Sequence, residues 1–224
     1  MYSGVTFSAP LLQDLKTSYQ ESPNGAGFSW LAGLNSLRVP ELSHGNQINT
    51  NHRLTVALEL DGVLASSTIF KPSEPCEFVE YETEEGTFAF YVCLRPGLQA
   101  FLAAAAQIAD LIVYTTAAPA YATALLDLID PAQTLFKKRF FRTECKLSHS
   151  GYVKDLNVLG LPLNNVLAVE SCEFSACLQT RQVISLRGTE AHLDALYQFL
   201  ETAVNSTDLS YAIRVFQHQQ RQLL

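Results

Sequence analysis

The sequence lacks several features that would place a chain in a broad class at once. No stretch approaches the roughly 18 consecutive apolar residues of a membrane-spanning helix. No Cys-x-x-Cys pair, internal repeat or low-complexity tract is present. The N-terminus has neither a charged start with a long apolar block nor an arginine-rich presequence. These absences predict a soluble globular protein without a transmembrane segment or a cysteine-rich zinc site.

Basic residues are also scarce, since 15 Lys and Arg stand against 22 Asp and Glu, for a net charge of -7. That balance disfavours an extended phosphate-binding surface, so nucleic acid is not an expected partner. A local basic groove is still compatible with this net charge. The cysteines are odd in number and scattered. They are predicted to be reduced, mostly buried thiols of an intracellular protein. They are Cys76, Cys93, Cys145, Cys172 and Cys177.

A hydrophobic content of 48% over 224 residues is enough for the core of one large domain. Residues 1–52 are rich in turn formers and predict a partly irregular extension. Within it, Phe28 to Leu37 has helix-like apolar spacing, which favours a short segment that docks on its own domain rather than on another protein. We expect the domain at residues 53–213 and a C-terminal tail at 214–224.

From residue 53 onward, strand and helix patterns alternate. Strands are predicted at 54–60, 110–116, 136–145 and 164–171, and helices at 97–109, 120–129 and 190–204. Residues 76–94 predict a hairpin around a Glu85-Gly86 turn, and 153–160 a short helical turn. Alternation of this kind predicts an α/β doubly wound parallel sheet with helices on both faces.

Polar side chains follow the predicted strands at their carboxyl ends, where ligands bind in such sheets. Taken alone, threonines there often satisfy backbone groups, and a lysine beside an aspartate is more often a surface residue. The polar residues are Glu59, Asp61, Thr115, Thr116, Glu170 and Ser171, with Lys154 at the start of the short helical turn.

The order of these residues resembles a known family. The segments that carry the likeness are "ELDGVL" at 59–64, "SSTIFKP", "FYVCLRPGLQAFL", "LIVYTTAAPAYATALLDLID" and "GYVKDLNVLGLPLNNVLAVES". They resemble the small C-terminal-domain phosphatases of RNA polymerase II, the NLI-interacting-factor type within the haloacid dehalogenase superfamily. The resemblance covers about residues 53–213 and implies a haloacid-dehalogenase-like sheet with a β-hairpin insertion after the first motif strand.

A mitochondrial inner-membrane translocase subunit is also similar, and it too departs at the first aspartate. The long insertion here is more like that of the small phosphatases. The resemblance therefore favours the nucleus or cytoplasm over the mitochondrion.

The resemblance implies a role for each position. Glu59 occupies the position of the nucleophile and Asp61 that of the general acid and base. Thr115 and Lys154 occupy the positions that contact the phosphoryl oxygens. Magnesium would be held by Glu59, by the backbone carbonyl of Asp61 and by Glu170. The family has aspartate at positions 59 and 170, and asparagine where this chain has Ser171.

The two lengthened carboxylates predict lost catalysis. One methylene moves a carboxylate by about 1.3 to 1.5 Å, and a misplacement near 1 Å costs on the order of 10²-fold. Magnesium demands nearly ideal octahedral oxygens at about 2.0 to 2.1 Å. We therefore expect a pseudophosphatase that binds a protein or a phosphorylated peptide as a scaffold. The alternative is a magnesium-dependent serine/threonine protein phosphatase that keeps weak activity through Glu59 and Asp61.

Overall fold

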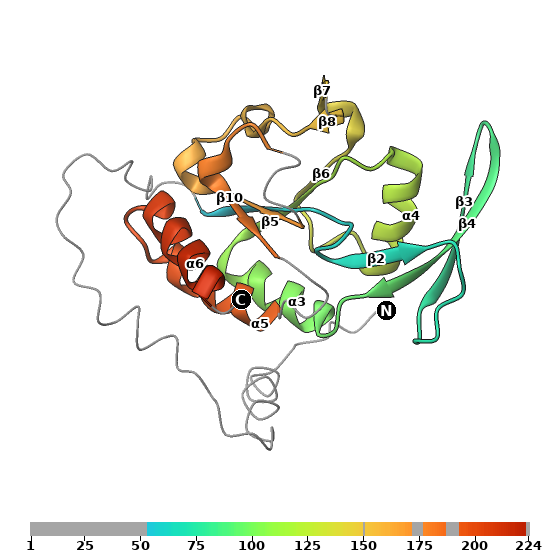
Figure 1. The fold of residues 1–224 in the computed structure, drawn as a ribbon, viewed down its shortest axis with the longest axis horizontal. Helices are drawn as coiled ribbons and strands as arrows, with labels where there is room; N and C mark the ends of the chain where they lie inside the picture. The colour runs from blue at the N-terminus through green and yellow to red at the C-terminus, as the bar shows by residue number, and fades with distance from the viewer. Residues whose placement is uncertain (1–52, 150, 172–176, 187–192, 223–224) are drawn as a thin grey trace, which may run out of the picture. The chain divides into compact units, whose positions relative to one another are not determined.

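The computed structural model describes residues 53–149, 151–171, 177–186 and 193–222. Its centre is a five-stranded sheet in the order β10-β9-β1-β5-β6, and every neighbouring pair is parallel (Figure 1). The strands are β1 (Thr55–Leu58), β5 (Asp110–Tyr114), β6 (Lys138–Phe140), β9 (Val166–Glu170) and β10 (Val183–Ser185). The predicted α/β architecture is confirmed, and β10 is an additional strand. The segment predicted at Phe28 to Leu37 and Cys172 lie outside the described residues.

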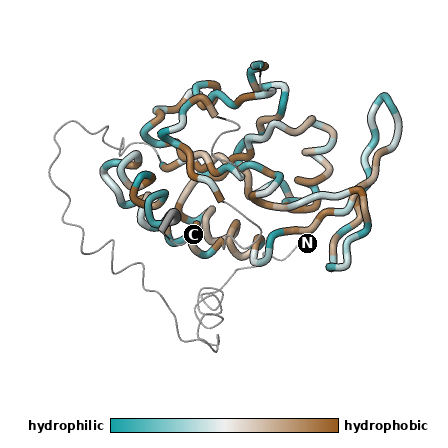
Figure 2. Tube along the Cα trace, in the orientation of Figure 1, coloured by the Kyte–Doolittle hydropathy of each residue, from teal (hydrophilic) through white to brown (hydrophobic). Residues whose placement is uncertain are grey.

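Side chains alternate between two hydrophobic layers along these strands, as the period of a β-strand requires. In β1, Val56 and Leu58 join the larger cluster, whereas Ala57 joins the smaller one on the opposite face. The strands of the central sheet are accordingly among the most hydrophobic parts of the chain (Figure 2). A sheet buried on both faces explains why the strand sequences read as apolar runs.

Four α-helices supply the larger layer: α3 (Leu98–Ile108), α4 (Pro119–Ile129), α5 (Leu193–Val204) and α6 (Leu209–Gln222). In the described part of the chain, the opposite layer receives Leu156 and Leu159 from a 3-10 helix, η2 (Leu156–Leu159). Three further 3-10 helices are η1 (Arg142–Glu144), η3 (Leu163–Asn165) and η4 (Thr180–Gln182). The boundary predicted at residue 213 falls inside α6, so residues 214–222 continue a helix rather than forming a separate tail.

The insertion after β1 is a three-stranded antiparallel sheet in the order β2-β4-β3. Its strands are β2 (Ala65–Thr68), β3 (Glu77–Thr83) and β4 (Gly86–Leu94). The hairpin turn lies at Glu84 and Glu85, one residue before the predicted position. A second hairpin, β7 (Lys146–Ser148) with β8 (Gly151–Val153), was not predicted.

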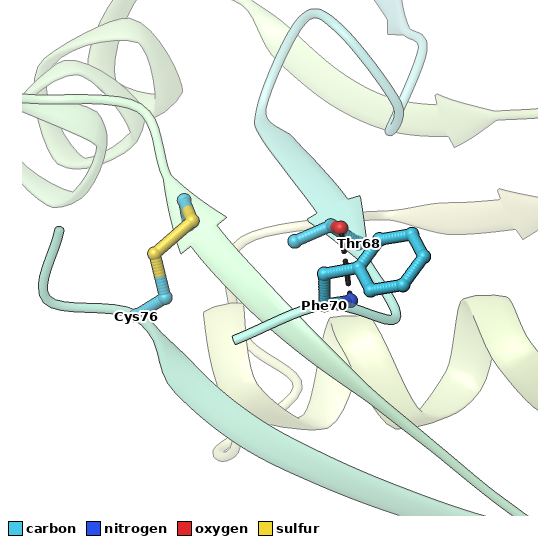
Figure 3. Close-up of a disulfide and its surroundings, with 4 residues drawn as sticks. Thr68, Phe70 and Cys76 are labelled. Atoms are coloured by element: carbon cyan, nitrogen blue, oxygen red, sulfur yellow. Dashed lines mark hydrogen bonds between the residues drawn. A yellow bond between two sulfur atoms is a disulfide. The ribbon is translucent and has the colours of Figure 1, made fainter. Parts of the chain in front are cut away.

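The prediction that all five cysteines are reduced is wrong for one pair. Cys76, directly before β3, forms a disulfide with Cys93 on β4, and Figure 3 draws it with Thr68 at the end of β2 and Phe70 in the loop that follows. The register explains the pairing, because Glu77 lies opposite Val92 and the next residues outward are the two cysteines. Cys145 and Cys177 are free thiols and only half-buried.

Arg95 fixes the loop that follows Asp61. Its Nε donates to the carbonyl of Val63 at 2.7 Å, and its Nη2 donates to the carbonyl of Gly62 at 2.5 Å. The backbone N–H of Arg95 also donates to the carbonyl of Leu64 at 3.0 Å. The start of the Arg-Pro-Gly segment thereby determines where the loop of residues 62–64 lies.

We expect Arg95→Lys to lower the free energy of unfolding by about 1 to 3 kcal/mol, because an ammonium cannot reproduce the two-pronged donation to neighbouring carbonyls. Urea denaturation measures the change. Arg214→Lys on the exposed face of α6 is the matched control and should stay within about 0.5 kcal/mol of the unmodified chain. Equal stability of the two variants would contradict the assigned role of Arg95.

Candidate functional site

The candidate site lies at the carboxyl edge of the central sheet. Glu59 directly follows β1, and its backbone N–H donates to the carbonyl of Val169 at 3.0 Å. Glu170 is the last residue of the neighbouring strand β9. Lys154 directly follows β8 and bridges to Cys177. Parallel pairing of β1 with β9 therefore brings two acidic side chains together, and the segment after β8 adds a cation to them.

The ammonium of Lys154 lies between the two glutamates. Its Nζ donates to Oε2 of Glu59 at 2.6 Å and to Oε1 and Oε2 of Glu170 at 2.7 and 2.9 Å. These three acceptors match the three N–H donors of an ammonium. We call Lys154, Glu59 and Glu170 the ion triad.

The carboxylate oxygens of the ion triad also all accept hydrogen bonds. The remaining carboxylate oxygen of Glu59, Oε1, accepts the backbone N–H of Leu60 at 2.8 Å. All four carboxylate oxygens of Glu59 and Glu170 thus have a donor within the chain. Lys154 has 0% of its surface exposed, and Glu59 and Glu170 have 6% and 3%. The three groups are therefore paired with one another rather than with water.

Burial and mutual attraction act in opposite directions on these groups. Burial disfavours the charged ammonium, but the carboxylates of Glu59 and Glu170 outweigh it and raise the pKa of Lys154. Two carboxylates share one ammonium, so the triad has one negative charge in excess. Burial and repulsion from Glu59 raise the pKa of Glu170 to about 7, against the attraction of Lys154.

Asp61 faces a different set of partners. Its Oδ1 accepts a hydrogen bond from the hydroxyl of Tyr121 at 2.6 Å and one from the hydroxyl of Ser67 at 3.0 Å. Those two hydroxyls also contact each other. Burial raises the pKa of Asp61 despite these hydrogen bonds, and the charge of Glu59 raises it further. A carboxyl that holds its proton more tightly is suited to a general acid.

Thr115 is buried, and its hydroxyl accepts the backbone N–H of Ala117 at 3.1 Å. This is the backbone-satisfying role that threonines at strand ends commonly have. Its predicted phosphoryl contact stays a prediction. The ring of Tyr114, one residue earlier, has its centroid 5.8 Å from the ammonium of Lys154, within the range of a cation–π contact.

The residue after Lys154 holds the segment in place. The carboxylate of Asp155 is buried and accepts hydrogen bonds from Gln179 Nε2 at 2.7 Å, from the backbone N–H of Asn157 at 3.1 Å and from the ammonium of Lys146. These donors, Lys146 first, hold the pKa of Asp155 well below its usual range. The anchored Asp155 fixes the backbone from which Lys154 reaches the glutamates.

Gly62 and Ser171 meet at the rim of the site. Gly62 has a φ of +80°, in the left-handed region that glycine tolerates best. A Cβ placed on Gly62 would lie 2.6 Å from the Cβ of Ser171, which is closer than real Cβ atoms approach. The loop after Asp61 therefore packs directly against the position where the resemblance expects asparagine.

The predicted magnesium ligands do not fit the ion as they are arranged. Oxygens that would bind the metal instead accept N–H groups from Lys154 and Leu60. In the described ranges, no group of three or more His, Cys, Asp or Glu side chains is placed to hold a metal ion. The ammonium of Lys154, rather than a metal ion, pairs with the two carboxylates.

Comparisons with known proteins assign the chain to a family. Residues 54–210, more than half of the chain, match the family described as NLI interacting factor-like phosphatase. The chain belongs to this family. Human carboxy-terminal domain RNA polymerase II polypeptide A small phosphatase 2 is 32% identical over 134 residues, which are 59% of this chain and 47% of that protein. Caenorhabditis elegans CTD small phosphatase-like protein 3 is 28% identical over 152 residues, 66% and 53% of the two chains.

The fold is also found among solved structures of this phosphatase family. Fission yeast RNA polymerase II CTD phosphatase Fcp1, in a variant bound to beryllium fluoride, gives a TM-score of 0.52 at 19% identity, covering 76% of this chain and 55% of that one. This likeness supports the haloacid-dehalogenase-like fold. The chain spans about half the length of the curated relatives it matches. No helix within the described residues is long and apolar enough to cross a membrane.

Three contributors to the site were not expected from the sequence. Tyr121 and Ser67 bind Asp61, and Asp155 anchors the segment of Lys154. Tyr121 and Ser67 lie in segments that carry the family resemblance, but their hydroxyls were assigned no role. Nothing in the spacing of residues 67 and 121 indicates that the two hydroxyls meet at residue 61.

Glu170 predicts a pH dependence of stability. Its pKa is about 7 in the folded chain and 4.5 when unperturbed, so the folded chain binds more protons between these values. The unfolding free energy should therefore fall as pH rises from about 5 to 8, by on the order of 1 to 3 kcal/mol. Urea denaturation across this range measures the slope. Glu170→Gln should flatten it, and an unchanged slope in that variant would contradict the assignment to Glu170.

Proposed function

We propose that this chain is a pseudophosphatase, a member of the phosphatase family that acts as a scaffold for a protein or a phosphorylated peptide. The observation that supports it best is the position of Glu59, whose two carboxylate oxygens both accept hydrogen bonds inside the chain. A nucleophile in phosphoryl transfer needs a free oxygen in line with phosphorus, roughly 3 to 3.5 Å away. Glu59 would have to break its buried ion pair before it could attack.

The buried polar contacts favour a protein surface over a phosphoryl group as the ligand. The ammonium of Lys154 has three acceptors and the hydroxyl of Thr115 serves a backbone N–H, so both predicted phosphate contacts already have partners. The name of the human relative refers to the carboxy-terminal domain of RNA polymerase II. For this chain we propose only that the partner is a protein. A nuclear or cytoplasmic location stays part of the proposal.

Exposed apolar side chains on the insertion give a scaffold function a surface. Ile69 and Phe70, in the loop between β2 and β3, are 73% and 75% exposed. Phe78 on β3 is 56% exposed, and its ring centroid lies 5.1 Å from that of Tyr91 on the adjacent strand. Contiguous exposed apolar patches commonly mark protein contacts, so these side chains of the insertion are candidates for one. The Cys76–Cys93 disulfide joins the end of the loop to β4 (Figure 3).

One observation favours the alternative, a magnesium-dependent serine/threonine protein phosphatase with weak activity. Asp61 keeps the residue type of a general acid, and burial raises its pKa as that role requires. In that case Glu59 would be an inefficient nucleophile, or Asp61 would activate water directly. The two functions make opposite predictions for hydrolysis of a simple phosphate ester.

The unmodified chain should show no hydrolysis of a chromogenic aryl phosphate above the rate of an Asp61→Asn control, with or without magnesium. The reason is that the carboxylate of Glu59 is bonded and misplaced for in-line attack. Release of the chromophore measures the rate. Magnesium-dependent turnover that Asp61→Asn abolishes would overturn the pseudophosphatase and establish the alternative.

Restoring the family residues tests whether geometry is the main defect. Glu59→Asp alone should stay near background, because residues that act as a unit return little when one is repaired. Adding Glu170→Asp and Ser171→Asn should raise magnesium-dependent aryl-phosphate hydrolysis by at least about 10²-fold over the unmodified chain. A folded triple variant without activity would show that more than these three positions separate the chain from an active phosphatase.

A further inference from the structure

The ion triad suggests what occupies the cation position of this site. The family resemblance places a divalent ion between residues 59 and 170, and the chain places the ammonium of Lys154 against both. Its Nζ contacts Glu59 at 2.6 Å and Glu170 at 2.7 Å. We propose that Lys154 is the resident cation of this site, a covalently attached substitute for the metal ion, and that the site takes no divalent cation while Lys154 is present.

The proposal explains why residues 59 and 170 are glutamates rather than the shorter aspartates that the resemblance expects. Lysine nitrogen and carboxylate oxygen pair at about 2.7 to 2.9 Å, whereas magnesium binds oxygen at about 2.0 to 2.1 Å. A lysine also offers three donors, so it needs acceptors on more than one side. In this chain Glu59 supplies one acceptor and Glu170 supplies two. Glutamate at both positions therefore agrees with an ammonium as the central cation.

Burial makes it unfavourable for a metal ion to displace the ammonium of Lys154. Lys154 is fully buried, and a metal that took the position of the ammonium would have to displace it from both carboxylates. A charge left without a partner in the interior is strongly unfavourable. Within the described residues, the acidic side chain nearest along the chain, Asp155, already accepts hydrogen bonds from Lys146, Gln179 and Asn157. An incoming divalent ion would thus compete with an ammonium whose neighbouring carboxylate, Asp155, already has other donors.

The test compares melting temperatures with and without added cation. Lys154→Met keeps the length of the side chain and removes its charge, and Lys138→Met on the exposed edge strand β6 is the matched control. In chelator, Lys154→Met should melt about 6 to 20 °C below the unmodified chain, because it leaves two buried carboxylates uncompensated. Lys138→Met should melt within about 2 °C of it.

Added cation then distinguishes an open site from a filled one. Calcium accepts irregular sets of carboxylate oxygens, so saturating CaCl2 should raise the melting temperature of Lys154→Met by at least about 5 °C. Neither CaCl2 nor MgCl2 should move the unmodified chain or Lys138→Met by more than about 1 °C. The triple variant Lys154→Met, Glu59→Gln, Glu170→Gln should melt above Lys154→Met and show no response to calcium.

Two results would overturn the proposal: stabilisation of the unmodified chain by MgCl2, or a Lys154→Met variant that behaves like Lys138→Met. If Lys154→Met does not fold, nuclear magnetic resonance of the unmodified, 15N-labelled chain decides. A buried ammonium with three acceptors should give a slowly exchanging signal that saturating MgCl2 leaves in place, and its loss would refute the proposal. The inference concerns the same site as the proposed function, but the two fail separately. Turnover of an aryl phosphate without stabilisation by magnesium would contradict the proposed function alone.

Discussion

The buried contact of one ammonium with two carboxylates is the constraint on which the site depends. Glu59 and Glu170 end neighbouring strands of a parallel sheet, so their charges meet in the interior and need compensation. Lys154 supplies it from a segment that follows the β7–β8 hairpin. The sheet order, the anchoring of Asp155 and the loop clamp by Arg95 all hold the elements that make this contact. The family's fold is retained, and the residues at the predicted nucleophile, metal and phosphate positions pair with one another.

The general acid position has a separate environment from the nucleophile position. Asp61 bonds Tyr121 on α4 and Ser67 on β2, whereas Glu59, two residues earlier, bonds Lys154 and Leu60. Each carboxyl is thereby tied to a different part of the fold. In phosphoryl transfer one carboxyl would attack phosphorus and the other would protonate the leaving oxygen, so both must reach the same phosphoryl group. The separate partners of the two carboxyls support the proposal that the chain acts as a binding protein.

Much of the fold was predictable because it follows from local periodicity. The long elements and the hairpin insertion each carry several apolar repeats, but β10 and the β7–β8 hairpin are three residues per strand and carry too few. The disulfide was missed because odd-numbered, scattered cysteines predicted reduced thiols, and because the turn placed one residue late put Cys76 out of register with Cys93. A two-residue turn at Glu84 and Glu85 sets Cys76 opposite Cys93. For the site, strand order predicted that Glu59 and Glu170 would meet. The contact of Lys154 with both depends on side-chain length and burial, which no motif states.

The close approach of Gly62 to Ser171 makes two distant positions share one small volume. A Cβ at residue 62 would overlap the Ser171 side chain. The side chain at 171 therefore fits only because residue 62 has no side chain. A bulkier residue at 171 can be accommodated only by pointing away from the loop or by moving it. The loop is also held by Arg95, so its freedom to move is small. A larger side chain at 171, such as asparagine, therefore has to point away from the loop, and any side chain at 62 would need the residue at 171 to shift.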